Sequence, residues 1–205
     1  MSDQLVVAVY SFGRNTIGLI TKPYETYRRI VNHGSRWELV PLAIIIGSYL
    51  GIASLVKTAA FRPYILTKQF VVLGIAVVMT YGLVVGLLWI VGKVVGGKGT
   101  VKTVALGWAY TLVPTTVWFL TTSLLYILIP PPRTGRPLGI LFSVLFLLFS
   151  SVLFFWKIIL SYLTMRFSMK LDLLRIGIVF IVVIPIVVIY SIGMYRLGIF
   201  KIPFV

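Results

Sequence analysis

Long apolar runs separated by short polar segments make up the chain from residue 37 onward. A helix needs about 20 mostly apolar residues to cross a bilayer core of about 30 Å. Each run comes close to that length or exceeds it, and basic residues or tryptophan flank most of them. The pattern therefore predicts five transmembrane helices, over residues 39–56, 70–91, 104–129, 138–156 and 176–195.

The segments between these runs are short. Pro130-Pro131-Pro132 cannot continue a helix, so a tight turn is expected there that ends at Pro137. The fourth span is expected to continue past Lys157 for another turn or two, because no helix breaker follows that lysine directly.

Residues 4–20 show helical periodicity with two different faces. Apolar residues fall on one face, whereas Gln4, Ser11, Arg14, Asn15 and Gly18 fall on the other, with Val7 as the main exception. This pattern is typical of an amphipathic helix lying in the membrane interface. A transmembrane helix is the alternative, although its polar residues would then lie in the middle of the span. The apolar face consists of Leu5, Val6, Val9, Phe12, Ile17, Leu19 and Ile20.

A second short helix is expected to begin at Pro23 and to end at His33-Gly34-Ser35. We therefore divide the chain into cytoplasmic amphipathic and juxtamembrane helices over residues 1–36 and one membrane domain over residues 37–205. The predicted fold class is an all-α integral membrane protein.

Composition agrees with this division. Hydrophobic residues make up 60% of the 205-residue chain and charged residues 11%. Because a soluble domain has about 25% charged residues, most of the surface is expected to face lipid. The mean hydropathy of +1.07 points the same way.

The net charge of +15 raises the possibility of a nucleic-acid partner. That partner is disfavoured because the basic residues lie at the ends of apolar runs, where they contact headgroups and determine topology. Residues on the N-terminal side of the predicted membrane include 12 Lys and Arg, and the other side includes seven. This excess places the N-terminus in the cytoplasm and the C-terminus outside.

Three stretches of the chain resemble the Yip1 domain family of five-span membrane proteins. The first is Pro23-Tyr24-Glu25-Thr26-Tyr27-Arg28-Arg29-Ile30, a proline followed by an aromatic and basic helix. The second is GGKGTVKTVALGWAYTLVP, from Gly96 to Pro114. The third combines Trp156, late in the fourth span, with Ser168-Met169-Lys170. The likeness extends over roughly residues 17–195.

The resemblance implies five spans with a cytoplasmic N-terminus. Eukaryotic members are associated with Rab GTPases and vesicle traffic, and they have a long hydrophilic N-terminal region with an Asp-Leu-Tyr-Gly type motif. This chain has about 36 residues before its first span and lacks that motif. The resemblance therefore implies a short prokaryotic-type member in the plasma membrane, without the GTPase partner.

Residues suited to catalysis or metal binding are scarce. The chain has no cysteine, a single histidine, His33, and no acidic residue inside any predicted span. The Gly92–Thr100 segment differs from a P-loop because Gly99, not Ser or Thr, follows Lys98. We therefore expect no enzyme activity, cofactor or metal site.

The candidate functional residues are instead basic residues that would bind anionic lipid on the cytoplasmic face. Two prolines, Pro114 and Pro185, are expected to kink spans three and five, and could frame a substrate site. Lys157 is expected to extend toward the headgroups. The candidate lipid-binding residues are Arg28, Arg29, Arg36, Lys93, Lys98, Lys102, Arg166, Lys170 and Arg175, and the candidate helix-packing residues are Gly47, Gly51, Gly82 and Gly86.

These features favour a non-catalytic membrane protein that organises the membrane, acts as a trafficking-like scaffold, or serves as an accessory subunit. Its expected partners are anionic lipids and other membrane subunits or further copies of itself. The alternative is a small-solute or lipid permease that uses the proline-containing spans.

Overall fold

The computed structural model describes residues 2–57, 63–128 and 137–199. These residues form seven α-helices and one 3-10 turn, with no strand among them. The elements are α1 (Ser2–Thr21), α2 (Pro23–His33), η1 (Arg36–Glu38), α3 (Leu39–Lys57), α4 (Pro63–Val94), α5 (Val101–Leu128), α6 (Pro137–Ser168) and α7 (Leu173–Arg196). The all-helical prediction is thus confirmed for the described residues.

Four helices in the described part of the chain are long and apolar enough to cross a membrane. Their apolar stretches are Phe70–Val94, Val101–Leu125, Gly139–Ser168 and Leu173–Arg196, which fall on predicted spans two to five. Helix α3 covers the first predicted span. The turn expected at Pro130–Pro132 lies outside the described residues.

Helix α6 continues well past Lys157 and ends at Ser168, further than the turn or two that the sequence suggested. At a rise of 1.5 Å per residue, its 32 residues extend over about 48 Å. The chain then turns sharply at Lys170, whose positive φ of 56° is incompatible with a continuing right-handed helix.

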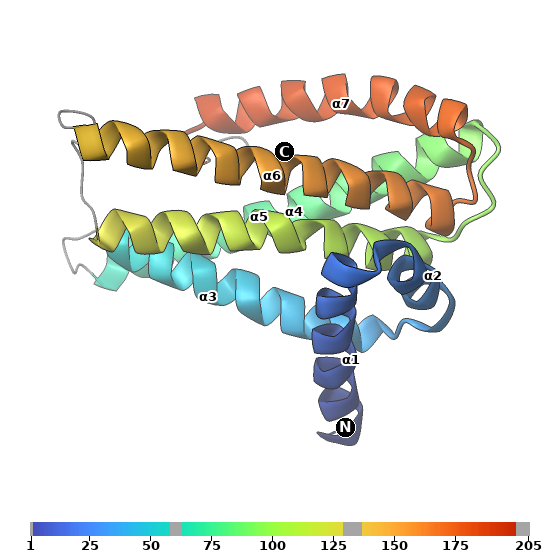
Figure 1. Cartoon of the computed structure of the whole chain (residues 1–205), viewed down its shortest axis with the longest axis horizontal. Helices are drawn as coiled ribbons and strands as arrows, with labels where there is room; N and C mark the ends of the chain where they lie inside the picture. Colours follow the sequence, from blue (N-terminus) through green and yellow to red (C-terminus); the bar gives the residue numbers. More distant parts are fainter. Residues whose placement is uncertain (1, 58–62, 129–136, 200–205) are drawn as a thin grey trace.

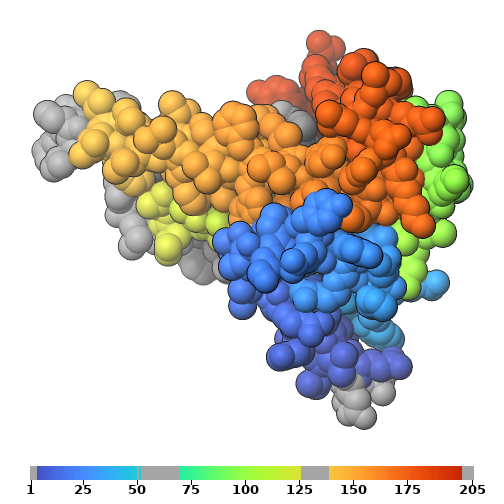
Figure 2. All heavy atoms as spheres, turned by 45° about the vertical axis from the view of Figure 1, so that its right-hand side comes forward, coloured from blue at the N-terminus to red at the C-terminus, as the bar shows by residue number. Residues whose placement is uncertain are grey.

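Helices α3 to α7 run along one common direction, and α1 runs across it (Figure 1). Helix α5 occupies the centre and packs against α2, α3, α4 and α6, whereas α7 packs mainly along α4. In the space-filling view, α1 and α2 cover one side of the bundle near one end (Figure 2). The first half of α6 extends beyond them.

The two larger clusters of buried side chains lie along α5 and α6, on which α4 and α7 converge in one cluster and α1 and α2 in the other. One joins Leu88 of α4 to Val104 of α5, Met165 of α6 and Val179 of α7. The other joins Tyr27 and Ile30 of α2 to α5 and α6. By contrast, only 6% of the most apolar 18-residue stretch of α6 is buried inside the protein. Apolar side chains on this outer surface require an apolar solvent, which for spans of this length is lipid.

Close packing at the convergent end depends on a glycine in α5. A Cβ added to Gly107 would lie 2.8 Å from Ser168 Oγ and 2.9 Å from Thr164 Cγ2, both on α6. These distances are too short for carbon, so a side chain here would push α6 away from α5.

We predict that Gly107→Ala lowers stability by about 1–3 kcal/mol through overpacking. The matched variant is Gly82→Ala in α4, where an added Cβ meets no atom within 4 Å. Alanine there should stabilise the helix by up to about 1 kcal/mol. Apparent melting temperatures in mild detergent would test both, and equal shifts for the two variants would contradict the packing described.

Candidate membrane-surface site

A carboxylate is buried at the start of the membrane domain. Glu38 ends η1 and is only 4% exposed. Its Oε1 accepts a hydrogen bond from the backbone N–H of Ser35 at 3.2 Å, and the Ser35 hydroxyl accepts one from Trp37 N–H at 3.3 Å. This reciprocal arrangement is a capping box, which the Ser-x-x-Glu sequence favours. It fixes the Glu38 side chain directly before α3.

Side chains from α1 and α5 complete the hydrogen bonding of this carboxylate. Ser11 Oγ donates to Oε1 at 3.1 Å, and Asn15 Nδ2 donates to Oε2 at 3.0 Å. The Tyr110 hydroxyl also donates to Oε2 and accepts a bond from Asn15 Nδ2 at 3.1 Å. With the Ser35 amide, Glu38 therefore accepts four hydrogen bonds. A buried carboxylate is tolerated only when it is bonded in this way.

Arg29 of α2 extends the arrangement. Its Nε and Nη2 donate to Asn15 Oδ1 at 3.1 Å and 2.8 Å. The Asn15 amide therefore lies between a guanidinium and a carboxylate, and both of its ends are bonded. We call Ser11, Asn15, Arg29, Ser35, Glu38 and Tyr110 the Glu38 network. It joins α1, α2, η1 and α5, and its buried polar groups satisfy one another.

The Glu38 network changes the interpretation of the N-terminal helix. Ser11 and Asn15 belong to the polar face predicted from the sequence, and the structure places them against protein. Asn15 is 2% exposed, whereas Val6 and Ile17, from the predicted apolar face, are 68% and 66% exposed. The polar residues turn inward because Glu38 and Arg29 offer them partners. Several apolar residues of α1, Val6 and Ile17 among them, therefore face outward, although Leu19 is buried against the bundle.

Tyr27 makes a second buried junction between α2 and the spans. Its hydroxyl donates to the Gly107 carbonyl at 3.2 Å and lies 3.2 Å from Thr164 Oγ1. Burial raises the pKa of Tyr27 above its ordinary value. The hydroxyl therefore stays protonated and available as a donor near neutral pH.

The nine candidate lipid-binding residues lie on segments that meet at one end of the bundle. The chain reverses there between α4 and α5 and again between α6 and α7, and α2 packs against α5 and α6 near the same end (Figure 1). A hydrogen bond of 2.9 Å from the backbone N–H of Lys98 to the carbonyl of Met169 links the two turns. Gly96 in the first turn has a positive φ of 96°, and the Arg175 guanidinium lies over it. We call this region the basic end.

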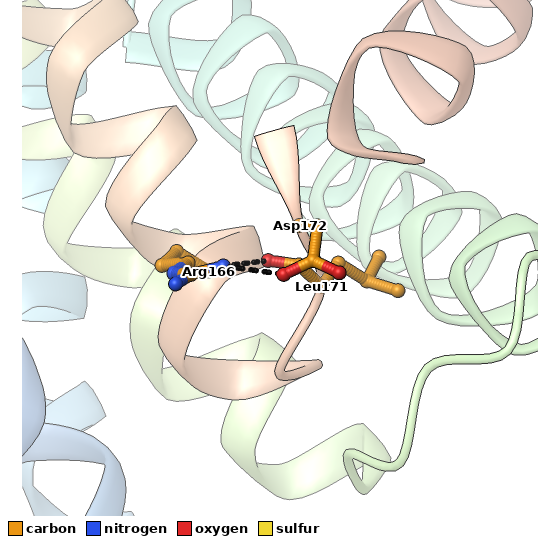
Figure 3. Close-up of polar contacts among 3 residues, drawn as sticks. All are labelled: Arg166, Leu171 and Asp172. Carbon is orange, nitrogen blue, oxygen red and sulfur yellow. Dashed lines mark hydrogen bonds and ion pairs between the residues drawn. The ribbon is translucent and has the colours of Figure 1, made fainter. Parts of the chain in front are cut away.

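Two of the nine residues are engaged within the protein. Arg29 belongs to the Glu38 network. Arg166 pairs with Asp172 at 2.9 Å and donates to the Leu171 carbonyl at 3.0 Å (Figure 3). The other seven side chains are exposed, and no ion pair to them occurs in the described residues: Arg28, Arg36, Lys93, Lys98, Lys102, Lys170 and Arg175.

The prolines and glycines singled out from the sequence lie apart from this end. Pro114 is buried inside α5, and Pro185 is exposed inside α7, and both helices continue past them. An added Cβ at the four candidate packing glycines would meet no described atom within 4 Å. Within the described residues, no other helix therefore packs closely against Gly47, Gly51, Gly82 or Gly86.

Sequence reasoning did not identify the Glu38 network. The Ser-x-x-Glu pattern and a lone asparagine in an apolar helix were the available signals. Within the described residues, no three His, Asp or Glu side chains lie together in a way that could hold a metal ion. The geometry instead suits a fixed structural junction beside an exposed basic surface.

We predict that Asn15→Leu destabilises the protein by about 2–4 kcal/mol, because Glu38 and Arg29 would each lose a bonded partner in a buried site. Asn32→Leu is the matched control, since Asn32 is exposed on α2 and should shift stability by less than about 0.5 kcal/mol. Apparent melting temperatures in detergent, with limited proteolysis of α1, would measure both. Equal losses would show that the Glu38 network contributes nothing particular.

Comparison with known proteins agrees with the expected resemblance. A family model described as the Yip1 domain matches residues 17–195, which include all of α2 to α6 and nearly all of α7. Searches of curated proteins and of solved structures give no match. Because the family model covers most of the chain, this multi-span membrane protein belongs to the Yip1 domain family.

Proposed function

We propose that this protein is a non-catalytic organiser of the membrane, acting as a scaffold or as an accessory subunit of a membrane complex. Its basic end would bind the anionic lipids of the cytoplasmic leaflet. The observation that supports this function is that seven exposed basic residues belong to three segments, far apart in sequence, that lie at one end of the bundle (Figure 1).

Few acidic groups oppose these charges. Glu38 is buried in its network, Glu25 lies 3.9 Å from Lys22, and Asp172 pairs with Arg166. Each basic group near an anionic surface contributes about 1 kcal/mol of attraction. Several such groups at one end would retain anionic lipid there, although each alone would hold it weakly.

We further propose five spans, with α3 as the first, a cytoplasmic N-terminus and an external C-terminus. The bias of 12 to seven basic residues in the sequence supports this orientation. It places the basic end in the cytoplasm, where anionic headgroups are concentrated.

In this arrangement, α1 lies along the membrane interface. Its direction across the spans supports this position (Figure 1). The outer faces of α1 and α2 also differ: α1 exposes Val9 and Ile17, whereas α2 exposes Glu25, Arg28 and Asn32. The boundary between the acyl region and the headgroups would therefore fall between these two helices.

A permease built on the proline-containing spans has less support. Pro114 and Pro185 lie in continuous helices, whereas midplane binding sites in transporters typically use interrupted ones. Pro185 is also exposed on the outer surface of α7 and does not face another described helix closely.

The test compares anionic lipid retained by wild type and by a triple variant, Arg28→Gln, Lys98→Gln and Lys102→Gln. These three side chains are exposed, whereas Arg29 would disturb the Glu38 network. Native mass spectrometry after reconstitution with phosphatidylglycerol and phosphatidylcholine should show bound phosphatidylglycerol falling by on the order of tenfold or more, from about 1 kcal/mol for each residue.

The control variant removes three charges elsewhere: Lys57→Gln, Lys68→Gln and Arg196→Gln. All three lie on the opposite side in the proposed topology. Retained phosphatidylglycerol should be unchanged in this variant. A similar loss of phosphatidylglycerol in both variants would indicate a general charge effect. No loss in the first variant would show that its three basic residues only determine topology and do not bind lipid.

A further inference from the structure

The outward face of α1 is unusually apolar for a helix that lies beside a bundle instead of within it. Its exposed apolar side chains fall opposite the contact with the bundle. Arg14 flanks this face, with its guanidinium 6.0 Å from the centre of the Tyr10 ring. The exposed residues are Val6, Val7, Val9, Tyr10, Ile17 and Ile20, at 56–70% exposure.

The length and direction of α1 place its apolar face on one side of the bundle only. Its 20 residues extend over about 30 Å. The helix contacts α2, η1 and α3, and it reaches α5 through the Glu38 network and through Phe12, whose ring stacks on Tyr110 with the ring centres 5.7 Å apart. Among the described helices, α3 to α7 share one direction, and none of them repeats this crossing arrangement on the opposite side (Figure 1).

The contact with the bundle fixes α1 firmly. The side of α1 that faces the bundle is formed by Ala8, Asn15 and Leu19, which are 1–2% exposed. Asn15 is bonded to both Glu38 and Arg29. Ser11 and Asn15, which a free amphipathic helix would direct to water, are thus used inside the protein, whereas Gln4 and Arg14 remain exposed. The face of α1 that remains available to the lipid is mostly apolar.

We propose that α1 is a built-in wedge that makes the protein prefer a convexly curved cytoplasmic leaflet. This inference rests on the proposed function, in which α1 lies in the interface. An amphipathic helix inserted about 5–10 Å into the headgroup and acyl boundary binds in a manner sensitive to curvature. It takes up area in one leaflet only, so a membrane that bends toward that leaflet accommodates it more easily.

Sorting between flat and tubular membrane tests the wedge directly. The chain has no cysteine, so Asn32→Cys on the exposed side of α2 gives a single fluorophore site. The labelled protein is reconstituted in giant vesicles of phosphatidylcholine and phosphatidylglycerol, and a narrow tube is pulled from each vesicle. An impermeant reductant identifies the molecules whose α2 faces outward. Their density per lipid in the tube should exceed that in the vesicle on the order of a few-fold.

Two variants separate the wedge from other causes of sorting. Val6→Ser, Val9→Ser and Ile17→Ser together should bring the density ratio to about one, because the outward face becomes polar. Val6→Leu, Val9→Leu and Ile17→Leu together keep the face apolar and should keep the enrichment. Since all three side chains point away from the bundle, both variants should fold with the same apparent melting temperature.

Equal densities of wild-type protein in tube and vesicle would overturn the wedge. Enrichment that persists in the serine variant would also overturn it, and would assign sorting to the shape of the spans. Retention of phosphatidylglycerol by the wild-type protein, measured in the same vesicles, distinguishes failure of the wedge from failure of the proposed function.

Discussion

Burial of the Glu38 carboxylate is the constraint on which the N-terminal half of this structure depends. A carboxylate removed from water must be bonded on both oxygens, and the donors come from α1, η1 and α5. Because Asn15 also accepts two bonds from Arg29, α2 is included in the same arrangement. One acidic side chain thereby determines how α1 crosses the bundle and which of its faces points outward.

Packing divides the bundle along its length. One of the larger buried clusters joins α4 to α7, and the other joins α1 and α2 to α5 and α6. Gly107 in α5 and Gly99 just before it allow close approach to the last residues of α6. The smaller cluster around Tyr49 and Phe119 lies between α3, α4 and α5. Outside these clusters the helices present apolar side chains to the surroundings, which is stable only in lipid. The basic end thus lies in a closely packed part of the described fold.

Hydrophobic periodicity was sufficient to predict the helical fold and the positions of the long apolar helices, and Pro23 was sufficient to predict the start of α2. These features are local, since each follows from about 20 residues of sequence. The Glu38 network is not local, because Asn15 and Tyr110 are 95 residues apart. A helical wheel showed that Ser11 and Asn15 share a face, but it could not show what lies against that face. For the same reason, the glycines that allow close approach, Gly99 and Gly107, were not among those chosen from their spacing.

Spin-label depth along α1 tests whether this helix lies along the membrane interface with its apolar face outward. Single cysteines placed from Val6 to Ile20 in lipid nanodiscs would be probed with oxygen and with a water-soluble relaxation agent. If α1 lies in the interface, the depths should oscillate with a period near 3.6 residues, with Val9 and Ile17 in the acyl region and Arg14 near the headgroups. Depth that changes steadily from one headgroup layer to the other, or full water exposure at every site, would contradict it.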